Sequence, residues 1–123
     1  MKITMIHSEW FPVPPVLGGP IAQTLFETAV SIHDPAITVI SPWSDALEGL
    51  EISPTGIFHH VDIEAQSEKV MQTLGNRLPS GLKTGAAARS FHYLNGVTDL
   101  LLDLNPDVIQ VHNRPEYVPY LVK

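Results

Sequence analysis

The chain opens with a short apolar run that leads through a proline- and glycine-rich turn into a helical pattern. Residues 2–8 (KITMIHS) have the length and composition of a strand buried on both faces. The stretch 10–15 (WFPVPP) then excludes helix, because proline removes backbone donors and restricts its neighbours. Gly18-Gly19 follows, and Pro20 begins a run with apolar residues at helical spacing. The order of buried strand, glycine turn and helix constrains the fold more than any other feature.

This order also suggests a place for a ligand. A helix that begins just after a buried strand directs free N–H groups, and the positive end of its dipole, at the carboxyl edge of the sheet. Gly18 and Gly19 have no Cβ, so a ligand can approach the backbone closely. A phosphate or a sugar hydroxyl would suit this place. A simple turn explains the two glycines equally well, because Gly-Gly alone is a weak signal.

Strands and helices alternate along the rest of the chain. The patterns predict strands at 36–41, 56–63 and 108–111, and helices at 64–74, at 87–104 and from 117 onward. The apolar stripe of the long helix consists of Ala87, Phe91, Leu94, Val97, Leu101 and Leu104. Alternation of this kind predicts an α/β fold, a Rossmann-like parallel sheet of about four strands with helices on both faces. The expected strand order is 3-2-1-4.

The expected order brings the carboxyl ends of the first and fourth strands side by side, where such sheets bind ligands. His112 directly follows the fourth strand, so we expect it to share a crevice with Gly18-Gly19. A polar residue in this position is solvated, paired or in contact with a ligand, and we favour a ligand role. Arg114 either binds a phosphate or carboxylate or forms a surface pair with Glu116.

Length and composition exclude several classes of protein. With 123 residues the chain forms one domain at most. The net charge of −6 argues against nucleic acid as a partner. No apolar run is long enough to be an integral membrane segment, and no signal peptide is recognisable. The sequence has no cysteine, which fits the cytoplasm, where we expect the protein to be.

Two other kinds of site are disfavoured. A nicotinamide-binding domain needs three glycines in the turn and an acidic residue after the second strand, where this chain has Ser41-Pro42. A metal site fits poorly because His59 and His60, as strand neighbours, point to opposite faces, one expected to be buried and the other exposed. We therefore expect no metal.

The remaining histidines leave alternatives open. His7 ends the first strand and is either a hydrogen-bonded core residue or a residue that reaches the crevice. His92 lies one residue beyond Phe91 and is expected at the flank of the apolar stripe. No serine–histidine–acid triad and no carboxylate pair can be assigned from spacing.

Several of these segments together resemble a known family. The opening KITMIHSEWFPVPPVLGG, the helix after it and the ending LNPDVIQVHNRPEY resemble the N-terminal domain of family 4 glycosyltransferases. These enzymes have the GT-B fold, in which two Rossmann-like domains face each other across a cleft. The proline-rich approach to Gly-Gly and the Asn-Arg-Pro near the end are most similar to a branch associated with spore-coat polysaccharide. The resemblance covers essentially all 123 residues in order.

The resemblance implies retaining transfer of a sugar from a nucleotide-sugar donor to a glycan or another acceptor, without a metal or other cofactor. By the same resemblance Gly18 and Gly19 lie against the phosphates and sugar of the donor, and His112 contacts the donor sugar at the reacting centre.

The family's N-terminal domain also supplies most of the acceptor site. The resemblance assigns this role to Trp10, Phe11, Asn113 and Arg114.

The sequence differs from the family in covering only part of the enzyme's length. The C-terminal domain, which holds the nucleotide-sugar, is absent from residues 1–123, so we expect a partial N-terminal domain that is inactive in isolation. The fourth strand would then have an open edge, which predicts self-association. The alternative is a stand-alone α/β binding or assembly module without catalysis.

Overall fold

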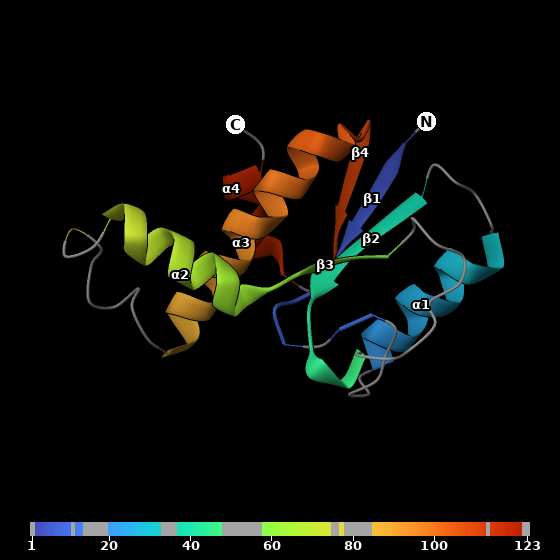
Figure 1. The fold of residues 1–123 in the computed structure, drawn as a ribbon. Coiled ribbons are helices and arrows are strands. Elements are labelled where there is room, and N and C mark those ends of the chain that lie inside the picture. The colour runs from blue at the N-terminus through green and yellow to red at the C-terminus, as the bar shows by residue number, and fades with distance from the viewer. Residues whose placement is uncertain are drawn as a thin grey trace.

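The computed structural model describes residues 2–10, 12–13, 20–32, 37–47, 58–74, 77, 85–112 and 114–121. These residues contain a four-stranded, all-parallel sheet with the order β3-β2-β1-β4 (Figure 1). The strands are β1 (Ile3–Ile6), β2 (Ile37–Pro42), β3 (Phe58–Val61) and β4 (Val108–Val111). The predicted fold class and strand order are confirmed.

Helices cover both faces of the sheet, as the alternating pattern predicts. The α-helices are α1 (Pro20–Ile32), α2 (Ile63–Leu74), α3 (Gly85–Leu104) and α4 (Val118–Leu121), and the 3-10 helices are η1 (Asp45–Leu47) and η4 (Pro115–Tyr117). Figure 1 shows α1 on one side of the sheet and α2 and α3 on the other. Among the described segments, no helix has both the length and the apolar character needed to cross a membrane.

The two faces form two separate hydrophobic clusters, because successive strand residues point to opposite sides. Met5 and Val39 pack with Leu25 of α1 on one face. Ile6 and Ile40 pack with residues of α3 on the other face. The sheet is therefore a buried middle layer at β1 and β2, as their apolar sequences predict.

Helix α3 presents a different face to the sheet in its first half than the apolar stripe predicts. Ala87 is exposed, whereas Ala88 is buried. His92, expected at the flank, is buried, and Tyr93 beside it is fully buried. This face of α3 can approach the sheet closely because residue 96 is a glycine. A Cβ at that position would collide with the side chain of Val61 in β3. Apolar periodicity misses this arc because it counts neither a tyrosine nor a glycine as core.

Strand β4 is less buried than its sequence predicts. Ile109 and Val111 pack against the cluster on the α3 side. Val108 and Gln110 are exposed, because α1 packs over β1 and β2 and no described element covers the corresponding face of β4. In the described residues β4 pairs only with β1, so its outer edge is open.

Candidate functional site

His7 and His112 lie next to each other at the carboxyl edge of the sheet. Their backbone amides extend the ladder one residue past the strand ends: His7 N donates to the Ile40 carbonyl and His112 N to the Ile6 carbonyl, each at 3.0 Å. The register pairs Ile6 with Val111, so the residues that follow are also neighbours. This is the place where the strand order reverses, which is where open α/β sheets bind ligands.

His7 is a buried imidazole without a hydrogen-bond partner for its ring. Its side chain belongs to a residue only 3% exposed, and within the described part of the chain neither ring nitrogen has a partner. Burial lowers the pKa of His7 from its ordinary 6.5 to about 4, and the neighbouring His112 and Arg114 act in the same direction. His7 is therefore a buried residue, as the first expected alternative requires, but among the described residues its ring lacks the hydrogen bonds that this alternative includes.

His112 is half-buried, and its Nε2 is buried without a partner among the described residues. Burial also lowers its pKa. Both imidazoles are therefore neutral at pH 7, and a neutral imidazole offers one donor and one acceptor. A sugar hydroxyl both donates and accepts, so a neutral imidazole at this edge matches a hydroxyl better than an anion.

The buried residue Glu9 lies at the same edge and contacts both α3 and the segment after β4. Glu9 Oε1 accepts a hydrogen bond of 3.0 Å from Ser90 Oγ, and Oε2 lies 3.8 Å from Arg114 Nε. The backbone carbonyl of Glu9 accepts a bond of 2.9 Å from Arg89 Nε. Glu9, in the segment after β1, thus balances the charge of Arg114. Of the two side chains, that of Glu9 is buried and that of Arg114 is partly exposed.

Tyr93 fixes the ends of the two central strands. Its hydroxyl donates to the His7 carbonyl at 2.7 Å and lies 3.3 Å from the Ile40 carbonyl. Burial, together with the charge of Glu9, raises the pKa of Tyr93 well above 10, so the group stays protonated as a donor. Helix α3 thereby holds the backbone from which His7 projects.

Trp10 supplies an exposed aromatic surface next to this network. Its side chain is 42% exposed, and the Arg89 guanidinium lies 5.1 Å from the ring centroid. A cation over one ring face keeps the indole in a defined orientation. This position is compatible with the acceptor role that the resemblance gives Trp10, which stays a prediction.

The structure brings part of the predicted site together. His112 and Arg114 lie at the edge beside His7, with Trp10 linked to them through Arg89 and Glu9. Four predicted site residues lie outside the described residues, and their roles stay predictions: Phe11, Gly18, Gly19 and Asn113.

His59 and His60 do not divide into a buried and an exposed residue. Both are half-buried. His60 Nε2 lies 2.7 Å from the Val13 carbonyl, and Ser41 Oγ accepts from Val13 N at 3.0 Å. Residues 12–13 therefore lie across the carboxyl ends of β2 and β3. The His60 ring has the Val13 carbonyl of this segment as its partner. No group of three or more metal-binding side chains occurs in the described parts of the chain.

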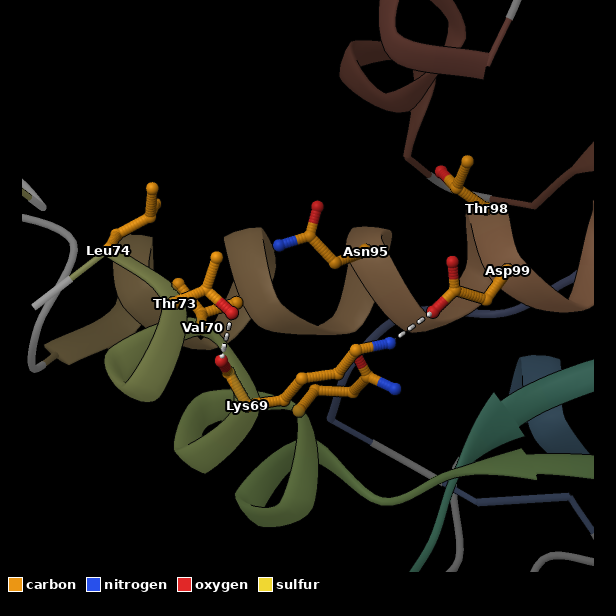
Figure 2. A pocket seen from close by; sticks show the side chains of 8 residues that line it. Lys69, Val70, Thr73, Leu74, Asn95, Thr98 and Asp99 are labelled. Carbon is orange, nitrogen blue, oxygen red and sulfur yellow. Dashed lines mark hydrogen bonds and ion pairs between the residues drawn. The ribbon is translucent and has the colours of Figure 1, made fainter.

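A groove of about 230 Å³ lies elsewhere, between α2 and α3. Figure 2 shows Lys69 of α2 reaching across it to Asp99 of α3, at 3.6 Å between the charged atoms. Both side chains are more than half exposed, so the pair is screened by solvent. None of the lining residues has a buried polar atom without a partner. The chemistry of the carboxyl edge makes it the better candidate site.

Sequence reasoning missed four residues of this edge: Glu9, Arg89, Ser90 and Tyr93. A signal existed for Glu9, because it is a charged residue three positions beyond the apolar run that ends at Ile6. No local signal marks Ser90 or Tyr93, whose partners lie 81 and 86 positions away.

Comparison of the chain with protein-family models, with curated proteins and with solved structures gave no match.

Proposed function

We propose that this chain forms part of a retaining glycosyltransferase that moves a sugar from a nucleotide-sugar donor to an acceptor, with His112 against the donor sugar. The observation that carries the proposal is the adjacent placement of two imidazoles, His7 and His112, at the point where the strand order reverses, where burial lowers the pKa of both. The sequence resemblance to family 4 glycosyltransferases points to the same place. A cytoplasmic location and a role in polysaccharide synthesis belong to the same proposal.

In such a transfer the bond between the sugar carbon and the phosphate oxygen breaks, and a bond from that carbon to the acceptor oxygen forms. The acceptor proton leaves with the nucleoside diphosphate. Positive charge develops on the sugar ring in the transition state, as in other reactions at glycosidic carbons. A neutral His112 can donate a hydrogen bond to a ring hydroxyl or accept one from it. It adds no positive charge that would oppose the charge developing on the sugar ring.

The isolated 123 residues should bind without turning over. A leaving diphosphate needs preorganised positive charge. At this edge Arg114 is balanced by Glu9, and Arg89 is engaged with Trp10 and the Glu9 carbonyl. The charge for the leaving group would come from outside the described residues, and the family resemblance assigns it to a second domain.

A titration followed by the imidazole signals in NMR spectra tests this function. Uridine and guanosine diphosphate sugars are added to the 123-residue chain, and nucleoside diphosphate release is assayed in parallel. We expect saturable shifts of the His112 signals and of the neighbouring His7 signals, loss of the His7 shifts in His112→Asn, and no release above buffer. The control variant His59→Asn, on β3, should bind like wild type. Binding that survives His112→Asn would contradict the proposed site, and turnover would contradict the proposed silence.

One observation favours a second candidate, an assembly module without catalysis. The outer edge of β4 is open in the described residues, and Val108 beside it is exposed. An open edge with apolar surface is suited to pairing with another chain. If no nucleotide-sugar shifts the His112 signals but the chain self-associates, this second candidate replaces the first.

A further inference from the structure

Among the described residues, Glu9 is unusual because its carboxylate is buried. It is 3% exposed, although an ionised carboxylate is costly to bury. A buried carboxylate is tolerated where hydrogen bonds and an opposite charge compensate it, and Glu9 has both, from Ser90 and from Arg114. Replacing such a pair by apolar residues is often neutral for stability, so stability alone does not account for it.

The contacts of Glu9 connect the segment after β1 to the segment that carries His112. Arg114 lies two positions after His112 and begins the turn into η4, where Tyr117 N donates to the Arg114 carbonyl at 3.0 Å. On its other side His112 is held by its own amide, bonded to Ile6. His112 is thus held to β1 through its backbone amide, and Arg114, two positions later, is held to the segment after β1 through its ion pair with Glu9.

We infer that Glu9 is a positioning residue: through Arg114 it fixes the orientation of the His112 imidazole toward the ligand. This inference rests on the proposed function, because it is the proposed function that gives His112 a ligand to contact. The ion pair between Glu9 and Arg114, through which Glu9 would act, is present without any ligand. Ser90 holds one carboxylate oxygen so that the other faces Arg114.

The test compares Glu9→Gln with the control Glu68→Gln, an exposed glutamate of α2. Glutamine keeps the shape of the side chain and can keep the bond to Ser90, but it removes the charge that balances Arg114. In the ligand-free chain we expect the His112 imidazole signals to shift or split in Glu9→Gln and to stay unchanged in Glu68→Gln. Affinity for the nucleotide-sugar that binds best should fall by about tenfold, the effect of losing one charge-assisted contact.

Three further variants keep the result decisive. Arg114→Gln should reproduce the effect of Glu9→Gln, and the double variant should be no worse than either one, because the two residues act as one unit. Glu9→Asp, which keeps the charge, should recover part of the affinity. Additive effects, or unchanged His112 signals in Glu9→Gln, would overturn the inference.

The readouts also separate this inference from the proposed function. If no nucleotide-sugar binds the wild-type chain, the proposed function fails, while the ligand-free imidazole signals still decide whether Glu9 positions His112. If Glu9→Gln does not fold, Ser90→Ala and Arg114→Gln give the same readout from the two partners of the carboxylate, and unchanged His112 signals in both would overturn the inference.

Discussion

The Tyr93 hydroxyl donates a hydrogen bond of 2.7 Å to the carbonyl of His7, so that helix α3 holds the end of β1 at the point where the candidate site begins. The contact is completely buried. It joins the long helix to the backbone of a site residue and predicts a specific cost when the hydroxyl is removed.

Tyr93→Phe should destabilise the chain by about 1–3 kcal/mol, because it leaves a buried carbonyl without its donor. Tyr117→Phe is a matched control. Tyr117 is equally buried, but its hydroxyl has no partner among the described residues, so its removal should cost little. Urea unfolding of the three proteins measures both effects. Equal losses in the two variants would show that the bond to His7 contributes nothing particular.

Stability should fall as the solution becomes acidic, because His7 is held neutral in the folded chain. Its pKa is about 4 in the fold and about 6.5 when unfolded, so between these values only the unfolded state binds the proton. By linkage the free energy of unfolding decreases as pH falls from about 6.5 toward 4 and levels off below, a total of about 3 kcal/mol.

Urea midpoints at pH 7, 5.5 and 4.5 check this dependence, since a midpoint can be compared within one protein across pH. Carboxylates also titrate at the lower end, so the informative quantity is the difference between wild type and His7→Gln. The slope should be markedly shallower in His7→Gln and unaltered in His59→Gln. A wild-type slope that persists in His7→Gln would mean that another group carries the dependence.

Gly96→Ala should destabilise the packing of α3 on β3. Alanine improves helix propensity by about 1 kcal/mol, but its Cβ would collide with the branched side chain of Val61, and overpacking costs about 1–3 kcal/mol. We expect a melting temperature several degrees below wild type. Val61→Ala makes room for the added Cβ. The double variant should therefore lose less stability than the sum of the losses in the two single variants. A Gly96→Ala chain as stable as wild type would show that α3 can move away freely.

Self-association should depend on the open edge of β4. Val108 is exposed on that strand, and the edge has no partner in the described residues. Sedimentation velocity over a range of concentrations should show a dimer that weakens in Val108→Lys, because an added charge on an edge strand opposes pairing. Leu102→Lys is the control, since Leu102 is more exposed but lies on α3. A monomer at every concentration would count against this prediction.

The fold followed from the sequence because the relevant signals are local. The apolar run ending at Ile6 and the run 108–111 are each readable alone, and rules of connection then give their order. His112 was identified for the same reason, since its position depends only on the strand before it.

The rest of the site depends on contacts between distant parts of the chain. Glu9 is buried where Ser90 and Arg114 meet it, and His92 is buried one helical turn before Gly96, whose face of α3 lies close to Val61. Neither local composition nor periodicity carries that information, so the charges that organise the site became visible only in three dimensions.

The most direct measurement of the central claim is the set of intermolecular NOEs between a bound nucleotide-sugar and the 123-residue chain. We expect cross-peaks from the sugar ring protons to the imidazole protons of His112. Cross-peaks from the sugar to Val70 or Thr98, in the groove between α2 and α3, with none to His112, would contradict it.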